Sequence, residues 1–307
     1  MLAAYITHAE CTLHEMGAGH PECPERLGAI HDQLLIKGLL DYMETYEAPL
    51  ATEEQLGRAH ALSYVREIIA SSPAEGYRQV DPDTSMNRFT VTAALRAAGA
   101  AVLATDLVLA GQAPSAFCNV RPPGHHAERA AAMGFCFFNN VAVGIRHALE
   151  VHGLERVALV DFDVHLGNGS EDIFRDDDRV LVCSIYEHGL YPFTEGLNGP
   201  HMISDPLPSR SGSEPFREAI ADGWIAALDG FRPELIYFSA GFDGHREDDM
   251  GNLGLVEADY AWATGQVMAV AGRHCQGRVI SCLEGGYELS ALGRSAAAHI
   301  KVLIGAD

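Results

Sequence analysis

The stretch Arg156-Val-Ala-Leu-Val-Asp-Phe-Asp-Val-His-Leu-Gly-Asn-Gly169 joins an apolar run to a cluster of polar groups. Residues 156–160 contain Val and Leu but no Pro or Gly, which is typical of a strand buried on both faces of a parallel sheet. Asp161, Asp163 and His165 follow at alternate positions, so their side chains leave a continuing strand on the same side. Ligands of open α/β sheets bind beyond the carboxyl ends of the strands, so this trio predicts a functional site there.

Similar apolar runs recur along the chain, with helical patterns between them. The expected strands are Ala3–Ile6, Ala116–Asn119, Val157–Asp161, Val180–Ile185, Leu235–Ser239 and Val279–Leu283. The expected helices cover residues 24–39, 89–110, 138–152, 214–229, 257–274 and 288–304, the fourth with Ser213 as its N-cap. This alternation predicts a parallel sheet, and without a linker or repeat we expect one domain over residues 1–307. Two long irregular stretches, 7–23 and 71–87, are expected at the rim of the site.

The composition narrows the class of protein. The chain has 307 residues, of which 48% are hydrophobic, and a formal net charge of −21. This charge argues against nucleic acid as a direct partner. The negative charge would favour a cationic substrate, but it is explained equally well by an acidic surface that only keeps the protein soluble. Seven cysteines, several in apolar strands, indicate reduced thiols. The sequence opens with no basic-then-apolar leader and has no uncharged apolar run of about 20 residues, so we expect a cytoplasmic protein that does not span a membrane.

Further polar motifs follow the other predicted strands. The segment Arg121-Pro-Pro-Gly-His-His-Ala-Glu128 comes after the second strand, and its two prolines stiffen a turn that presents His125 and His126. Asp243 comes after the strand that ends at Ser239, and Glu284-Gly-Gly-Tyr287 follows the last strand. Four strand ends therefore deliver Asp, His and Tyr side chains to the same edge of the sheet.

Asp163, His165 and Asp243 have the composition of a catalytic zinc site, with three protein ligands and an open position for water. Imidazole is a poor ligand for magnesium, which favours zinc, whereas iron, cobalt and manganese remain compatible with these ligands. Such a metal lowers the pKa of bound water from 15.7 towards about 7 and polarises a carbonyl group. The cluster predicts a hydrolase.

The remaining polar residues fit acid–base roles in that reaction. His125 and His126 would act as general base and general acid. Asp161 and Asn168 would orient them, each by accepting a hydrogen bond from an imidazole nitrogen. Tyr287, which follows two glycines, is suited to donate a hydrogen bond to the developing oxyanion.

Each motif also has a simpler interpretation. Asp is common in turns and at strand ends, and buried histidines often serve only structure. A competing metal site is also suggested by the pairs Cys11/His14 and His20/Cys23, whose local spacing resembles a structural zinc site. The combination of three motifs at different strand ends favours the metal-dependent hydrolase.

Taken together, these motifs resemble the zinc-dependent histone deacetylase family, in particular its class II-like bacterial histone deacetylase-like amidohydrolases, and more distantly the acetylpolyamine amidohydrolases. The resemblance covers nearly the whole chain and rests on six ordered motifs: 20–27, 121–128, 134–140, 161–169, 239–243 and 284–287.

The resemblance implies a single arginase/deacetylase-like α/β domain with about eight parallel strands, helices on both faces and the active site at the C-terminal strand ends. It implies one Zn²⁺ on Asp163, His165 and Asp243, and a structural K⁺ held by main-chain carbonyls of 161–165 with Ser184 nearby. It also assigns residues to the substrate channel, with Arg26 near its buried end and Met250 as a gatekeeper at its mouth. These channel residues are Phe135, Tyr191, Met250, Gly285 and Arg26.

Two positions depart from the family pattern. Leu166 stands where most relatives have a second histidine, but the predicted ligands and proton carriers are all retained. The rim sequence Met86-Asn87-Arg88 lacks the usual proline after Asp83-Thr84, so rim contacts cannot be transferred from relatives.

Several functions are compatible with these residues. The favoured one is removal of an acetyl or longer acyl group from an Nε-acyl-lysine side chain of a protein or peptide, and the alternative is deacetylation of a small cationic polyamine. Apolar Met250 favours the lysine substrate, whereas the acidic run 247–249 beside it keeps the polyamine open. A non-catalytic binder would have lost a ligand or the tyrosine. A binuclear manganese ureohydrolase would need an acidic ligand where this chain has Gly167.

Overall fold

The computed structural model describes residues 1–306 and contains one eight-stranded parallel sheet. The strand order is β2-β1-β5-β10-β9-β6-β7-β8, and a separate antiparallel pair is formed by β3 and β4. The strands are β1 Ala3–Thr7, β2 Met43–Glu47, β3 Arg78–Asp81, β4 Thr84–Met86, β5 Ser115–Cys118, β6 Val157–Asp161, β7 Val180–Glu187, β8 Met202–Leu207, β9 Leu235–Ala240 and β10 Val279–Leu283. The predicted α/β class and parallel sheet are confirmed.

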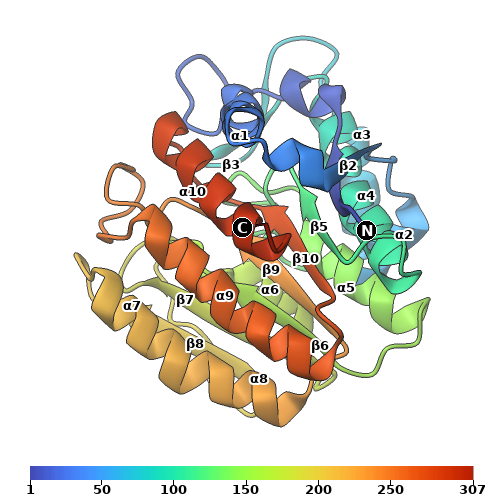
Figure 1. Cartoon of the computed structure of the whole chain (residues 1–307). Coiled ribbons are helices and arrows are strands. Elements are labelled where there is room, and N and C mark those ends of the chain that lie inside the picture. Colours follow the sequence, from blue (N-terminus) through green and yellow to red (C-terminus); the bar gives the residue numbers. More distant parts are fainter. Residues whose placement is uncertain (307) are drawn as a thin grey trace.

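Helices connect and cover the strands. The α-helices are α1 Glu25–Ile36, α2 Glu53–Ala59, α3 Leu62–Ala70, α4 Thr90–Leu109, α5 Asn140–Glu150, α6 Asn168–Phe174, α7 Ser213–Ala219, α8 Ile225–Phe231, α9 Glu257–His274 and α10 Leu289–Leu303, with short helices η1 Ala9–Leu13, η2 Leu39–Tyr42 and the π-helix η3 Ile220–Trp224. Helices α1, α10 and α9 cover one face of the sheet, whereas α4 and α5 pack together against the other (Figure 1). Helices on both faces were expected from the family resemblance.

The six strands predicted from apolar runs all form, and burial explains why they were predictable. Every residue of β5, β6, β7, β9 and β10 is buried, as expected for strands covered by helices on both faces. The two edge strands were not predicted. β2 is largely exposed and β8 contains Pro206, so neither has a continuous apolar run.

Helix α4 is long and apolar enough to cross a membrane by length and composition, although it contains Arg96 and Asp106 and so is not the uncharged run considered in the sequence analysis. Two thirds of its apolar window is buried, and the helix packs on α5 and on strands β1, β5 and β10. This packing is that of a core helix, because its apolar side chains are covered by protein.

The predicted helix over residues 214–229 is interrupted. Its observed course is α7, the π-turn η3 and then α8. The prediction of Ser213 as N-cap was wrong: Gly212 occupies that position, and the Ser213 hydroxyl instead donates to Asp259 Oδ2 at 2.8 Å. The short helices α2, α3 and α6 were not predicted.

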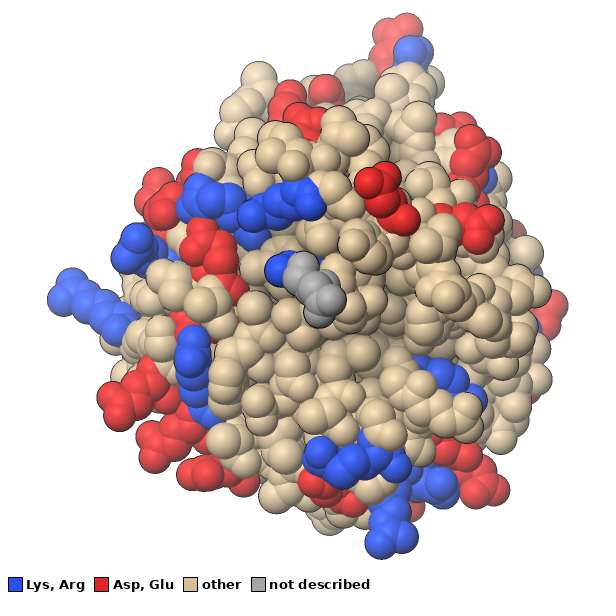
Figure 2. Space-filling view, in the orientation of Figure 1, with Lys and Arg blue, Asp and Glu red and all other residues tan. Residues whose placement is uncertain are grey.

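The two predicted rim stretches contain more structure than expected, since residues 7–23 include η1 and residues 71–87 include the β3–β4 hairpin. The surface seen in Figure 2 carries acidic and basic side chains interspersed around a largely uncharged centre. The net charge of −21 therefore does not form a single acidic field on this face.

Candidate active site

The predicted metal ligands converge at the carboxyl ends of β6 and β9. Asp163, His165 and Asp243 each offer a ligand atom, and these atoms lie within 4.8 Å of one another. His165 Nδ1 is 3.0 Å from Asp163 Oδ1 and 3.2 Å from Asp243 Oδ2. Asp243 Oδ2 is buried and accepts no hydrogen bond, which is costly unless a cation or water supplies the missing partner. The donor set and this orphaned oxygen fit a divalent metal ion.

The glycine at position 285 leaves room for these carboxylates. A Cβ atom at Gly285 would lie 2.0 Å from Asp243 Oδ2 and 2.6 Å from Asp163 Oδ2. The Gly285 N–H also donates to Asp163 Oδ2 at 2.8 Å. Gly285, assigned to the channel from the family resemblance, therefore also forms one wall of the ligand cluster.

Space is also limited beside Asp161, on the other side of the cluster. A Cβ atom at Gly167 would come within 2.4 Å of Asp161 Oδ2. An acidic residue at position 167, as a binuclear centre would need, would therefore displace the Asp161 carboxylate that accepts from His125. The described residues thus provide one ligand cluster at the strand ends.

The adjacent histidines lie beside the ligand cluster with their rings 4.0 Å apart between centroids. His125 Nδ1 is 3.0 Å from Asp161 Oδ2, and His126 Nδ1 is 2.8 Å from Asn168 Oδ1. The Asn168 amide nitrogen donates to Glu128 Oε1 at 2.9 Å, so its oxygen faces His126. Both histidines therefore donate through Nδ1 to the partners predicted from sequence, leaving Nε2 for chemistry.

The two histidines have different electrostatic surroundings. Burial lowers the pKa of His125, but the nearby carboxylates of Asp163 and Asp161 outweigh it and raise the pKa to about 10. Burial, together with the charge of His125, holds the pKa of His126 well below its usual value. Burial and the charge of Asp163 raise the pKa of Asp243 to about 6, which expresses the cost of two buried carboxylates side by side.

Tyr287 lies on the opposite wall, next to Arg26. The guanidinium of Arg26 sits over the Tyr287 ring, 4.9 Å from its centroid. Arg26 donates to the Gly286 carbonyl at 2.6 Å, to the Glu284 carbonyl, and to Glu22 Oε1 at 3.0 Å. Arg26 is fully buried beside Tyr287, and its hydrogen bonds are directed to protein acceptors.

The two aromatic residues predicted to flank a channel contact the proposed catalytic residues. Tyr191 packs edge-on against His126, with centroids 5.0 Å apart, and Phe135 packs edge-on against Tyr287 at 6.0 Å. Phe135 has a positive φ of 68°, unusual for a bulky residue, and its N–H donates to Thr84 Oγ1 at 3.0 Å. Thr84 of the β3–β4 hairpin thus holds the backbone of Phe135 in place. The sequence placed segment 71–87 at the rim of the site but did not predict this contact.

Two buried carboxylates organise the site and were not singled out from the sequence. Glu284 Oε2 accepts the N–H groups of Gly124 and His125 at 2.6 and 3.0 Å. Glu22 pairs with Arg121 through both carboxylate oxygens at 2.5 Å. Both glutamates lie within motifs noted above, but a sequence does not reveal that they bind backbone N–H groups or a distant arginine.

Met250 lies at the edge of a cavity of about 390 Å³ beside Tyr287. The same cavity is lined by Glu247, Asp248 and Asp249. The predicted gatekeeper therefore lies next to a concentration of carboxylates, so both substrate interpretations keep a structural basis.

A second cluster of metal-ligating types, formed by Asp106, His147 and His152, lies where α4 and α5 end. Both histidine Nε2 atoms approach Asp106 Oδ1, at 2.8 and 2.7 Å. Arg58 donates to His147 Nδ1 at 3.0 Å, which requires the His147 proton to reside on Nε2. Hydrogen bonding to Asp106 therefore accounts for this cluster without a metal.

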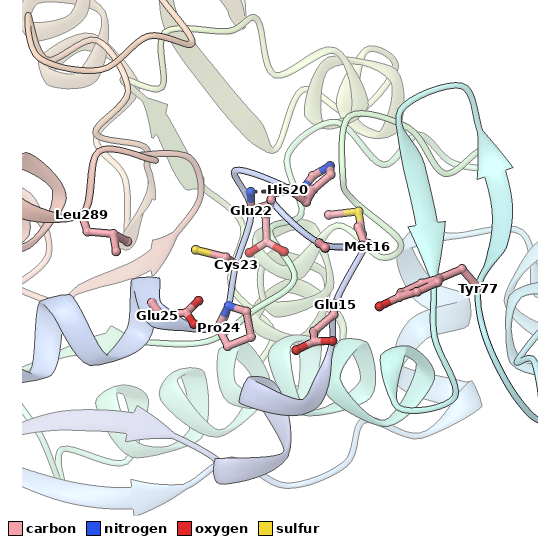
Figure 3. Close-up of a pocket in the computed structure, with 12 residues that line it drawn as sticks. Glu15, Met16, His20, Glu22, Cys23, Pro24, Glu25, Tyr77 and Leu289 are labelled. Carbon is pink, nitrogen blue, oxygen red and sulfur yellow. Dashed lines mark hydrogen bonds between the residues drawn. The ribbon is translucent and has the colours of Figure 1, made fainter.

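The competing zinc site in the N-terminal loop does not assemble. His14 Nδ1 contacts Thr90 Oγ1 at 2.8 Å, and Cys11 is buried against α4. His20 and Cys23 border a cavity of about 510 Å³ and point in different directions (Figure 3). Within residues 1–306, these four side chains do not form a group that could share a metal.

Comparison with known proteins is consistent with this geometry. Residues 20–303 match the histone deacetylase domain. The chain belongs to the histone deacetylase family. A probable deacetylase of Archaeoglobus fulgidus is 35% identical, with 94% of this chain and 82% of that protein covered. A histone deacetylase-like amidohydrolase of Pseudomonas aeruginosa is 36% identical, with coverage of 88% and 73%.

Other members of the histone deacetylase family are similar over nearly the whole chain. The polyamine deacetylase HDAC10 of Mus musculus is 35% identical, over 99% of this chain and 48% of that protein. The crystal structure of the HDA15 HD domain superposes with a TM-score of 0.91 and 32% identity, covering 99% of this chain and 88% of that one. The chain is thus a histone deacetylase family hydrolase with the arginase/deacetylase fold.

Proposed function

We propose that this protein is a zinc-dependent amidohydrolase that removes acetyl or longer acyl groups from Nε-acyl-lysine side chains. The observation that carries the proposal is the buried cluster of Asp163, His165 and Asp243, in which Asp243 Oδ2 lacks a hydrogen-bond partner. The cluster stands beside a histidine pair and a tyrosine, the groups that amide hydrolysis needs for proton transfer and oxyanion stabilisation.

One ion per chain would be held by these three residues and would polarise the amide carbonyl while lowering the pKa of a water molecule. Gly285 preserves the space of the two carboxylates, and its N–H fixes the orientation of Asp163. Such contacts behind the ligands hold them in position before the substrate arrives.

We assign proton removal from the attacking water to His126. Its Nδ1–H is directed at the neutral Asn168 oxygen, and its low pKa keeps Nε2 free to accept a proton. His125 donates to the carboxylate of Asp161, which stabilises its imidazolium form, so it is suited to carry a positive charge and to protonate the leaving amine. This assignment reverses the order in which the sequence analysis gave the two roles.

Tyr287 would donate its hydroxyl hydrogen bond to the oxyanion that forms from the acyl carbonyl. Burial and the charge of Asp243 hold the pKa of the Tyr287 phenol well above its usual value, so it remains a donor. Phe135 and Tyr191 would flank the aliphatic stem of the acyl-lysine, since two aromatic faces accommodate methylene groups while excluding water.

We further propose a structural K⁺ beside the catalytic centre. The Ser184 hydroxyl oxygen is buried without a hydrogen-bond partner, and Ser184 is the register neighbour of Asp161 on the adjacent strand. Oxygen ligands without competing donors suit a hard cation. The carbonyls of residues 161–165 would complete its coordination.

A second candidate, deacetylation of an acetylated polyamine, is favoured by the acidic cavity at Met250. Asp249 in this cavity is exposed, so its carboxylate is available to a distal ammonium group. Met250 favours the acyl-lysine substrate instead, because an apolar gatekeeper gives a polyamine no charged partner at the proposed channel.

The test combines metal analysis with turnover. Purified wild-type protein should contain about one zinc ion per chain by the three-ligand argument. It should also release a fluorogenic amine from an acetyl-lysine peptide, whereas Tyr287→Phe should be at least about 100-fold slower, as for loss of an oxyanion donor. A competition panel of acetyl-lysine, longer acyl-lysine and acetylpolyamine substrates then separates the two candidates. Absence of turnover after zinc reconstitution, or full activity of Tyr287→Phe, would contradict the proposal.

A further inference from the structure

Asp248 is a buried carboxylate near Tyr287 that the proposed chemistry does not use. Only 5% of its surface is exposed. Its Oδ2 atom accepts the N–H groups of Tyr287 at 2.6 Å and of Glu288 at 3.0 Å. Its Oδ1 atom accepts the N–H of Met250 at 3.0 Å. The Asp248 side chain therefore accepts three backbone N–H groups. One belongs to Tyr287, the proposed oxyanion donor, and another to Met250, the predicted gatekeeper.

The backbone around Tyr287 needs such support because it lies outside regular structure. It follows β10 and precedes α10, and Gly286 adopts a positive φ of 114° that few residues other than glycine accept. The carbonyl of Gly286 is held by Arg26 on one side. Asp248 holds the N–H groups of the next two residues on the other side, so the direction of the phenol depends on both anchors.

We propose that Asp248 is a positioning residue, which sets the position of the Tyr287 hydroxyl by fixing the Tyr287 and Glu288 amides and connects it to the channel mouth at Met250. The inference rests on the proposed function of Tyr287. Carboxylate hydrogen bonds to backbone N–H groups are charge-assisted and therefore stronger than neutral ones, which suits a rigid anchor. Misplacement of a reacting group by about 1 Å costs on the order of 100-fold in rate.

The test is a double-mutant cycle with Asp248→Asn and Tyr287→Phe, assayed on an acetyl-lysine peptide. Asp248→Asn keeps the shape of the side chain but replaces one acceptor oxygen by an NH₂ group that cannot accept from an N–H. We expect it to lower kcat by about 10- to 100-fold, as for other supporting residues, with a smaller change in KM. In the Tyr287→Phe background, the same substitution should change kcat by less than about threefold, because the hydroxyl it positions is already absent. Asp178→Asn, an exposed substitution with the same change in charge, is the matched control.

A rate of Asp248→Asn within about threefold of the wild type, or an equal loss in both backgrounds, would overturn the inference. Melting temperature and zinc content accompany each variant, and Asp248→Ser is the second variant in case the first does not fold. Failure of both to fold while Asp178→Asn folds would also overturn it, since the carboxylate would then act on folding. Calorimetric binding of acetohydroxamate, a metal chelator whose carbonyl can accept from Tyr287, gives a readout without turnover. The wild type could be inactive while Asp248→Asn still weakens acetohydroxamate binding in the wild-type background and not in the Tyr287→Phe background. That result would contradict the proposed function and support the role of Asp248.

Discussion

Substitution of Gly285 by alanine should strongly weaken metal binding while leaving the fold intact. The added Cβ would stand 2.0 Å from Asp243 Oδ2 and 2.6 Å from Asp163 Oδ2, whereas real Cβ contacts essentially never fall below 3.0 Å. The Asp243 oxygen must therefore retreat by about 1 Å, because the backbone of Gly285 is tied to Asp163. Metal–ligand distances tolerate deviations of only about 0.2 Å, so this displacement removes a ligand.

The assay for Gly285→Ala measures zinc per chain by atomic spectroscopy and kcat on an acetyl-lysine peptide. We expect zinc well below stoichiometric and a kcat at least about 100-fold lower than wild type. The matched control is Gly272→Ala in α9, where a Cβ meets nothing within 4 Å. That control should keep full zinc and activity and gain up to about 1 kcal/mol of stability from helix propensity. Stoichiometric zinc and wild-type kcat in Gly285→Ala would refute the steric reasoning.

Four further outcomes follow from the same geometry. Asn168→Asp places a carboxylate on His126 and raises its pKa, so the acid limb of the kcat/KM–pH profile should move to higher pH; an unchanged profile would contradict our choice of base. Burial lowers the pKa of His299 to about 3, so its contribution to stability is complete above its ordinary pKa of about 6.5 and is lost as pH falls towards 3. In urea unfolding, the free energy of unfolding of the wild type should accordingly fall by about 2 kcal/mol more than that of His299→Gln between about pH 7 and pH 5. Met250→Glu should raise the ratio of acetylpolyamine to acetyl-lysine turnover, measured by competition; no change in the ratio would remove Met250 as gatekeeper. Dialysis against a chelator should abolish turnover and lower the melting temperature, with both restored by Zn²⁺, since a ligand of the native state alone stabilises it.

The central sheet was predictable because strands that are buried on both faces have largely apolar sequences. β6 is apolar up to its last residue, Asp161, and β10 is apolar apart from Ser281; polar groups follow at the ends of both strands. The edge strands have a weaker sequence pattern, since β2 has the sequence Met-Glu-Thr-Tyr-Glu and is exposed along most of its length. Pairing with β1 makes β2 a strand, and that partner is distant in sequence.

The residues of the site also differ in how well the sequence predicts them. Side chains proposed as metal ligands, such as Asp163 and His165, are marked by residue type and spacing at a strand end. Side chains that act through the backbone are not: Glu284 and Asp248 accept N–H groups from loops 160 and 39 residues away in the chain. Their partners carry no distinctive side chain in these contacts, so no sequence pattern identifies the pair.

The buried charges of the site also support the cation that we propose for it. Two arginines lie fully buried nearby, but Arg121 pairs with Glu22, and Arg26 divides its donors between Glu22 and two carbonyls. Neither has a hydrogen bond or ion pair to Asp163 or Asp243 among residues 1–306. The charged partners of these two carboxylates are histidines: His165 Nδ1 is 3.0 and 3.2 Å from Asp163 and Asp243, and His125 Nε2 is 3.8 Å from Asp163. Burial of two carboxylates side by side carries a large desolvation cost, which a bound cation would offset. The arginines stabilise the scaffold beneath the site, whereas the ion that we propose would neutralise the carboxylates of the ligand cluster.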